Sequence, residues 1–139
     1  MKHILLDTNI VLDLLARRMP FYDEAAELFS LADRKTIILS LSSLSLANTH
    51  FVISKYRPEQ EARQIIRNFK VLVQELSMDD KILDLALNSD FKDFEDAIQY
   101  FTAIENGQQL IVSRNLSGFR NSKIPVMTAR EFIESLRSD

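Results

Sequence analysis

The chain has 139 residues, of which 46% are hydrophobic and 27% charged, and it contains two glycines, three prolines and no cysteine. This length predicts a single domain over residues 1–139 with a core of its own, and the absence of cysteine excludes disulfide bonds and thiolate chemistry. The net charge of −3 argues against a generic basic nucleic-acid coat, and no apolar run approaches the ~20 residues that span a bilayer, so we expect a cytoplasmic protein with no membrane partner.

Short apolar runs and helical periodicities alternate along the chain. Residues 4–6 predict a buried strand that runs directly into a helix. The further strands are expected at 36–39, 70–76, 110–112 and 124–127, and the helices near 10–15, 25–32, 43–56, 58–69, 79–88, 93–106 and from 128 onward. Strands that are apolar throughout and alternate with helices are typical of parallel sheets covered on both faces. The sequence therefore predicts a three-layer α/β/α sandwich with a mostly parallel central sheet.

The helix expected at 43–56 has an apolar side that the spacing of its residues predicts. Ser42 and Ser43 can cap its N-terminus. Its buried side is expected to carry Leu44, Ala47, Phe51 and Val52.

Two predicted strands end in polar residues. Asp7-Thr8-Asn9 follows the first strand, and Ser113-Arg114-Asn115 follows the strand at 110–112. In open parallel sheets, ligands bind outside the carboxyl ends of the strands, so these side chains are candidates for a site. Asp7 is also a good N-cap for the helix that follows it, which is an equally strong interpretation of that residue alone.

A third group of polar residues opens the helix near 93–106. Asp93 and Asp96 are three residues apart and therefore share one face of the helix, where two carboxylates repel each other unless a cation lies between them. Acidic residues in a first turn also complement the helix dipole, and this explains at least one member of the set Asp93, Glu95 and Asp96.

Several chemistries are excluded by what the sequence lacks. The two glycines, Gly107 and Gly118, form no phosphate-binding loop. The two histidines, His3 and His50, lie in unrelated segments, which argues against a Ser-His-Asp site or a histidine-rich metal site. Carboxylate and amide oxygens remain, and these suit a hard cation such as Mg²⁺ or Mn²⁺.

Three segments resemble the PIN domain family, the small nuclease fold found in VapC-like toxins of bacterial toxin–antitoxin pairs. Residues 5–15 (LLDTNIVLDLL) look like its opening motif, residues 94–103 (FEDAIQYFTA) its central acidic helix, and residues 110–115 (LIVSRN) its last core strand and exit. The three segments come in the family's order.

The resemblance implies cleavage of RNA phosphodiesters with Mg²⁺ or Mn²⁺ held by a cluster of usually four acidic residues. Asp7 matches the first acid and Asp96 the third. Asn48 occupies the place of the second and Asn115 that of the fourth, and Gly118 stands where some relatives have an acid. With two neutral replacements, one weakly held metal ion is expected, to which Asp93 or Glu95 can add a carboxylate from the same helix turn. An antitoxin partner and a homodimer are further implications of the resemblance.

The remaining residues of interest surround these acids. Thr8, Asn9 and Ser113 are candidates for orienting the carboxylate or a metal-bound water, with capping and turn formation as the alternative. Arg114, Arg120 and Lys123 follow the exit strand and are candidates for contacts with RNA phosphates.

Three functions stay open at this point. The first is a PIN-type ribonuclease. The second is a protein of the same fold that binds RNA or a partner protein without cleaving RNA. The third is a metal-dependent phosphatase that acts on a small molecule.

Overall fold

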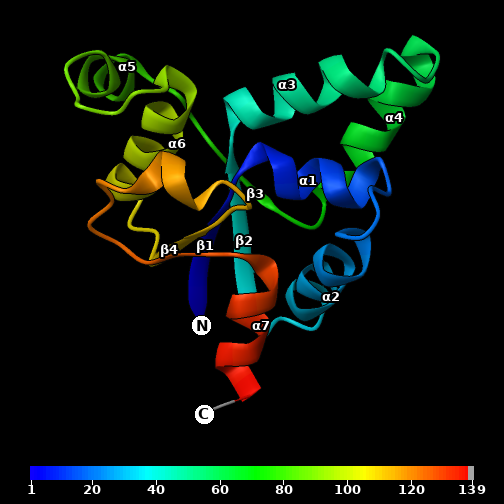
Figure 1. Cartoon of the computed structure of the whole chain (residues 1–139). Coiled ribbons are helices and arrows are strands. Elements are labelled where there is room, and N and C mark those ends of the chain that lie inside the picture. The colour runs from blue at the N-terminus through cyan, green and yellow to red at the C-terminus, as the bar shows by residue number, and fades with distance from the viewer. Residues whose placement is uncertain (138–139) are drawn as a thin grey trace.

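The computed structural model describes residues 1–137 and confirms the α/β/α sandwich (Figure 1). Its central sheet has five parallel strands in the order β3-β2-β1-β4-β5. The strands are β1 (Lys2–Leu6), β2 (Ile37–Ser42), β3 (Gln74–Leu76), β4 (Leu110–Val112) and β5 (Val126–Met127).

The helices begin and end close to the predicted positions. They are α1 (Thr8–Leu15), α2 (Tyr22–Asp33), α3 (Ser43–Ile53), α4 (Glu59–Lys70), α5 (Asp80–Leu87), α6 (Phe94–Glu105) and α7 (Ala129–Arg137), with a short 3₁₀ helix η1 (Leu116–Phe119). Side-chain caps explain several starts, because the side chains of Asp7, Ser42, Asp79 and Asp93 each accept a hydrogen bond from a backbone N–H of the helix that follows. At α7, the Thr128 N–H donates to Glu131 Oε1 (2.9 Å) and the Glu131 N–H donates to Thr128 Oγ1 (3.1 Å).

The two faces of the sheet pack against different helices. Ile4 and Leu6 are fully buried in a core cluster shared with α1, α2 and α7. Leu5, which points to the opposite face, packs with Tyr100 and Ala103 of α6. Successive residues of a buried strand alternate between the two faces, so a continuous apolar run is what a covered parallel sheet requires.

The strand order places a topological switch point between β1 and β4. From β1 the chain builds β2 and then β3 outward on one side, and it returns to form β4 on the other side of β1. Leu6 pairs with Val112, and the Asp7 N–H donates to the Val112 carbonyl (3.0 Å). The next residues, Asp7 and Ser113, are therefore neighbours at the crevice where such sheets bind ligands.

Two expectations about the elements are wrong. The strand expected at 70–76 is limited to β3, because α4 continues through Lys70 and the chain then turns, which leaves Val71 85% exposed. The buried side of α3 was also misassigned, since the helix buries Ser45, Leu46, Thr49 and Ile53 and leaves Phe51 62% exposed. Ser45 can face the interior because its hydroxyl has hydrogen-bond partners there.

None of the helices within residues 1–137 combines the length and the hydrophobicity of a membrane-spanning segment.

Candidate acidic site at the carboxyl ends of β1 and β4

Asp7 is the most enclosed acid of the site. Its side chain is 7% exposed, because the residue leaves the central strand and immediately caps α1. One carboxylate oxygen accepts the Thr8 N–H (2.8 Å). The other accepts the Ser113 hydroxyl (2.7 Å) and, at 3.4 Å, the Asn9 amide. Asp7 is therefore the N-cap of α1, and it also stands at the switch point of the sheet.

The turn after β4 connects Asp7 to Asp96. Ser113 Oγ donates to Asp7 and accepts the Asn115 N–H (2.9 Å). The Asn115 side chain then donates through Nδ2 to Asp96 Oδ2 (3.1 Å). Asp7, which ends β1, and Asp96, in the first turn of α6, are thus brought to the same place by the strand-exit residues between them.

The electrostatics of the two acids show that they share an environment. Burial raises the pKa of Asp7, although hydrogen bonds from Ser113 and Thr8 oppose this effect. Burial, together with repulsion from Asp93 and Asp7, raises the pKa of Asp96 to about 6. The site therefore holds more negative charge than its surroundings balance.

The burial of Asp96 and its repulsion by Asp93 and Asp7 give Asp96→Asn a pH-dependent effect on stability. Because the pKa in the folded chain is raised from 3.8 to about 6, the folded state binds the proton more tightly, and wild-type stability falls as pH rises through this window. Removing the charge should stabilise the protein by roughly 1 kcal/mol at pH 7.5, a value discounted because the side chain is partly exposed, and by almost nothing at pH 4. Urea denaturation at the two pH values measures this, and an equal effect at both would contradict it.

Asp93 is the N-cap of α6. Its carboxylate caps α6 by accepting the Asp96 N–H (2.9 Å). Within residues 1–137, no three His, Asp or Glu side chains form a group able to hold a metal ion. Asp93 therefore does not complete a three-carboxylate cluster with Asp7 and Asp96, and it acts on them as a nearby charge.

The donor set nevertheless fits one divalent cation. Asp7 and Asp96 supply carboxylate oxygens, each of which has more lone pairs than its hydrogen bonds use. Hard cations prefer such oxygens, and a cation would offset both the burial and the mutual repulsion that raise the pKa values of the two acids. The residues are too few for the full ligand shell of an ion, so water would have to complete it.

Gly118 closes the far side of Asp96. A Cβ atom at this position would overlap Asp96 Oδ2 and Asn115 Nδ2, so the absence of a side chain lets η1 lie directly against the acid. We expect Gly118→Ala to displace Asp96, to break its hydrogen bond with Asn115 and to lower any metal-dependent activity of the site about tenfold or more. A steady-state rate measurement on this variant tests the expectation, and an unchanged rate would contradict it.

Asn48 lies on α3, one turn after Ser45, and it makes no side-chain hydrogen bond to Asp7 or Asp96 within the described residues.

Ser45 and Gln99 were missed by the sequence analysis. Ser45 Oγ lies 2.7 Å from Thr8 Oγ1 and accepts Gln99 Nε2 at 2.7 Å. The spacing Asp96–Gln99 on one helix face was a signal, but a buried glutamine could not be distinguished from an exposed one by sequence.

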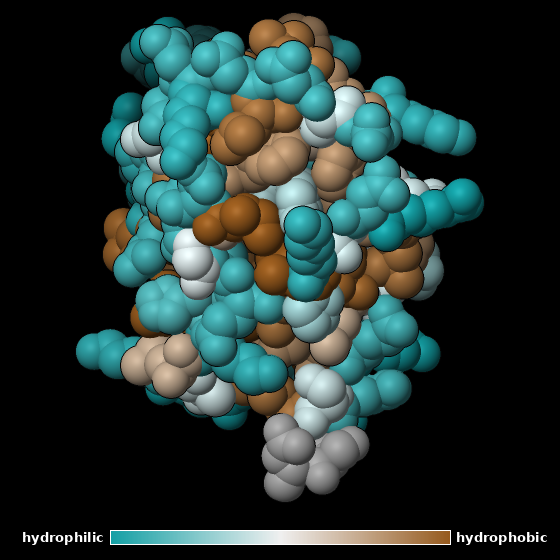
Figure 2. All heavy atoms as spheres, turned by 90° about the vertical axis from the view of Figure 1, so that its left-hand side faces the viewer, coloured by the Kyte–Doolittle hydropathy of each residue, from teal (hydrophilic) through white to brown (hydrophobic). Residues whose placement is uncertain are grey.

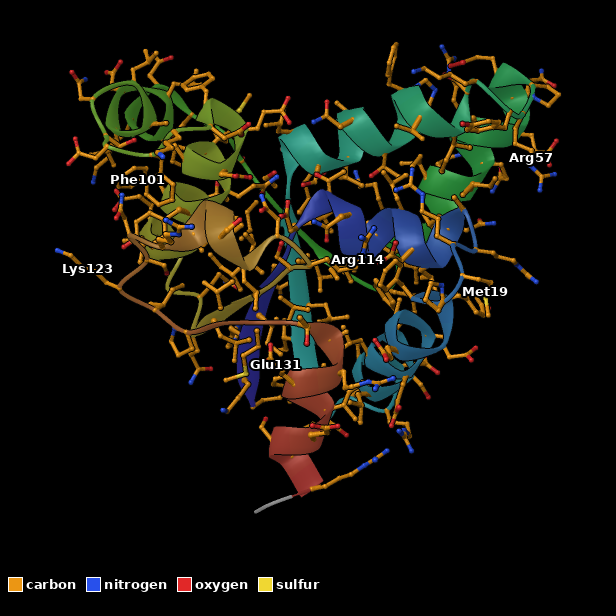
Figure 3. The ribbon with its side chains drawn as sticks, in the orientation of Figure 1. Met19, Arg57, Phe101, Arg114, Lys123 and Glu131 are labelled. Atoms are coloured by element: carbon orange, nitrogen blue, oxygen red, sulfur yellow. The ribbon has the colours of Figure 1, made fainter. Side chains whose placement is uncertain are left out.

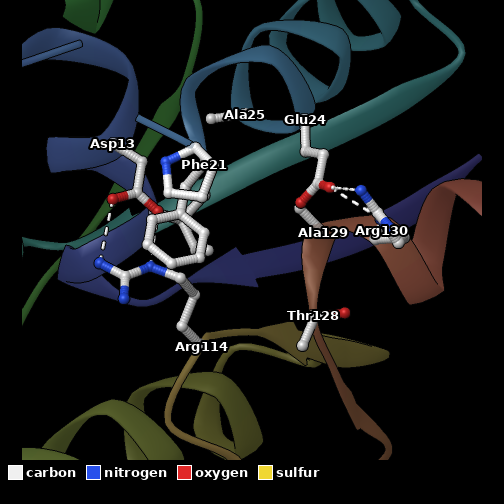
Figure 4. Close-up of a pocket in the computed structure, with 10 residues that line it drawn as sticks. Asp13, Phe21, Glu24, Ala25, Arg114, Thr128, Ala129 and Arg130 are labelled. Atoms are coloured by element: carbon white, nitrogen blue, oxygen red, sulfur yellow. Dashed lines mark hydrogen bonds and ion pairs between the residues drawn. The ribbon is translucent and has the colours of Figure 1, made fainter. Parts of the chain in front are cut away.

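Arg114, a candidate for phosphate contacts, forms an ion pair with Asp13 (Figure 4). Its Nε and Nη2 atoms donate to the two carboxylate oxygens of Asp13 (2.8 and 3.0 Å), and Asp13 is 1% exposed. Its guanidinium also stacks 4.0 Å from the ring centroid of Phe21. The pair borders a cavity of about 300 Å³ on whose other side Arg130 pairs with Glu24. Arg114 thus ties the β4 exit to α1.

The other two basic residues face different cavities. Arg120 lines a cavity of about 530 Å³ together with Asp96, Asn115 and Lys92. Lys123 lines a separate cavity with Phe101 and Ile104, and its side chain extends outward, away from Arg114 (Figure 3). The face of the molecule that carries α5 and α6 is mainly hydrophilic, with separate hydrophobic areas (Figure 2). Arg120 therefore lines the same cavity as Asp96, and Lys123 lines a neighbouring cavity that shares Asp90, Phe91 and Asn121 with it.

Comparisons with known proteins agree with this architecture. A family model described as PIN domain matches residues 3–117. The curated Ribonuclease VapC1 of Aquifex aeolicus is 24% identical over 135 residues, which cover 94% of this chain and 93% of that protein.

Solved structures share the fold at lower identity. A DNA-bound VapBC from Salmonella typhimurium aligns with a TM-score of 0.70 and 18% identity, over 93% of this chain and 99% of the other. VapBC2 from Rickettsia felis, bound to a promoter DNA fragment, aligns with a TM-score of 0.67 and 18% identity, over 90% and 96%.

The fold is an α/β/α sandwich with a parallel sheet, and two acids lie at its switch point. Proteins of this class bind ligands at the carboxyl ends of their strands. The family match covers most of the chain, and the protein belongs to the PIN domain family.

Proposed function

We propose that this protein is a divalent-metal-dependent endoribonuclease of the VapC-like type, acting in the cytoplasm as the toxin of a toxin–antitoxin pair. The observation that carries the proposal is the convergence of Asp7 and Asp96, from the end of β1 and the start of α6, on one electronegative site. Membership of the PIN domain family and the similarity to a curated ribonuclease support it.

Asp7 and Asp96 are the proposed ligands of Mg²⁺ or Mn²⁺, with the amide groups of Asn115 and Asn48 as neutral neighbours. When bound, such an ion polarises a phosphate and lowers the pKa of a coordinated water. The protein's own residues fix the acids: Ser113 and the Thr8 N–H hold Asp7, and Asn115 holds Asp96. Replacing an acid by an amide removes a full charge, so we expect weak metal binding at this site.

The cavity beside Asp96 is the proposed entry for RNA. Arg120 and Lys92 line it and can contact the sugar–phosphate backbone, which positions a strand without reading its sequence. Arg114 is less suited to this task because Asp13 already occupies its guanidinium.

Protein partners are proposed from the relatives. The neighbours described as VapBC complexes, and a toxin–antitoxin complex from Klebsiella pneumoniae, support an antitoxin partner for this chain. A homodimer is also proposed, and the exposed aromatic residues Phe51 (62%) and Tyr56 (77%) offer apolar area for an interface.

A second function is favoured by one observation. Residues 1–137 contain no group of three His, Asp or Glu side chains placed to hold a metal. A PIN-fold protein with this reduced set of acids can bind RNA or a partner without cleaving RNA.

RNA cleavage in the presence of increasing Mn²⁺ or Mg²⁺ separates the two functions. A nuclease gives metal-dependent fragments that disappear with a chelator and in Asp7→Asn. If wild type and Asp7→Asn give the same background at every metal concentration while both retain RNA affinity, the protein is a binding protein.

A further inference from the structure

A buried polar network lies directly beneath the acidic site. Its centre is the Ser45 hydroxyl on α3, which is fully buried. Ser45 Oγ lies 2.7 Å from Thr8 Oγ1 of α1 and accepts hydrogen bonds from Gln99 Nε2 of α6 (2.7 Å) and from Ser42 Oγ (3.3 Å). Three helices that border the site therefore meet at one hydroxyl group.

The direction of the hydrogen bond between Ser45 and Thr8 follows from the number of hydrogen bonds that the Ser45 hydroxyl can accept and donate. A serine Oγ has two lone pairs and one hydrogen to donate. Gln99 and Ser42 use the two lone pairs of Ser45, so the Ser45 hydrogen is donated to Thr8 Oγ1. The hydroxyl hydrogen of Thr8 must then point away from Ser45.

Thr8 is well placed to use that hydrogen. The residue follows Asp7, to which its N–H donates, and it is partly exposed whereas Ser45 is not. A donor that points out of the protein beside a carboxylate can meet an oxygen of a bound phosphate, and hydrogen bonds to charged groups are stronger than those between neutral groups.

We propose that Gln99 is a positioning residue, which acts through Ser45 to present the Thr8 hydroxyl as a hydrogen-bond donor to a phosphate oxygen of RNA held at Asp7 and Asp96. The proposal rests on the ribonuclease function proposed above. Because Gln99 lies one turn after Asp96, the same contact also fixes the start of α6 against α1 and α3.

The cost of burying Gln99 supports a specific role for it. The side chain is 2% exposed, and its Oε1 atom has no hydrogen-bond partner within the described residues. An unsatisfied buried oxygen destabilises the fold, and an apolar side chain of similar size would avoid the penalty. The glutamine does, however, supply the Nε2 donor to Ser45, and this hydrogen bond makes the Ser45 hydroxyl donate to Thr8.

A double-mutant cycle tests the proposal, with kcat and KM for RNA cleavage measured on Gln99→Met, Thr8→Val and the combined variant. Each single change should lower kcat/KM about tenfold, because each removes the hydrogen bond from the Thr8 hydroxyl to the phosphate oxygen. The combined variant should also lose about tenfold, whereas independent effects would multiply to about a hundredfold. Thr8→Ser, which keeps the hydroxyl, should retain activity to within about twofold of wild type.

Thr102→Val is the matched control. Thr102 is a fully buried polar residue on the same helix as Gln99, and its hydroxyl has no partner within the described residues. Its replacement should leave kcat and KM unchanged.

The outcomes separate the inference from the proposed function. Losses that multiply, an unaffected Gln99→Met, or a Thr8→Ser variant as impaired as Thr8→Val would overturn the positioning role while leaving the ribonuclease intact. A wild-type protein that does not cleave RNA would overturn the function, and the positioning role with it.

Discussion

Replacing Asp7 or Asp96 by asparagine is expected to lower the rate of metal-dependent RNA cleavage by at least about 100-fold. Each change removes one of the two carboxylates that converge at the end of β1 and the start of α6. The amide keeps the shape of the side chain but loses the negative charge that binds and orients a divalent ion, and each factor of ten corresponds to about 1.4 kcal/mol of the barrier. Initial rates at saturating Mn²⁺ measure the effect.

Asp93→Asn is the matched control for these two variants. Asp93 accepts the Asp96 N–H as the N-cap of α6, and asparagine caps helices about as well as aspartate. We therefore expect its rate to stay within about threefold of wild type. A loss at Asp93→Asn as large as that at Asp7→Asn would show that Asp93 is a metal ligand and not only the N-cap of α6.

Arg114→Met is expected to reduce the free energy of unfolding by about 3 kcal/mol, the largest stability effect we predict. Arg114 donates two hydrogen bonds to Asp13, whose side chain is 1% exposed. Without the guanidinium, a buried carboxylate loses its counter-charge, which is far more costly than losing an exposed pair. Urea denaturation at neutral pH measures the change.

Two further variants test that explanation. Combining Asp13→Leu with Arg114→Met should recover much of the lost stability, because it removes the unpaired charge as well. Arg130→Met breaks the pair with Glu24, where the arginine side chain is 70% exposed, and should cost less than about 1 kcal/mol. If Arg114→Met is no more harmful than Arg130→Met, the Asp13 pair does not hold the β4 exit in place.

Much of the architecture could be predicted because its signals are local. The apolar runs of β1 and β4 and the polar residues that follow them specify buried parallel strands with functional groups at their carboxyl ends. The meeting of Asp7 with Ser113 then follows from strand order alone, since β1 and β4 are neighbours in register.

The parts that could not be predicted depend on partners distant in sequence. Arg114 looked free to bind phosphate because Asp13, its partner, lies 101 residues away. The buried face of α3 was misread because Ser45 faces inward, where its contacts with Thr8 and Gln99, 37 and 54 residues away, make its burial favourable. Spacing within one helix carries no information about such pairs.

A crystal of the protein soaked with Mn²⁺ and measured at the manganese absorption edge tests the central claim most directly. We expect one anomalous peak in contact with carboxylate oxygens of both Asp7 and Asp96, and no such peak in crystals of Asp96→Asn. Manganese bound to one of these acids alone, or found elsewhere on the molecule with the pair unoccupied at saturating ion, would contradict a shared metal site and the nuclease function derived from it.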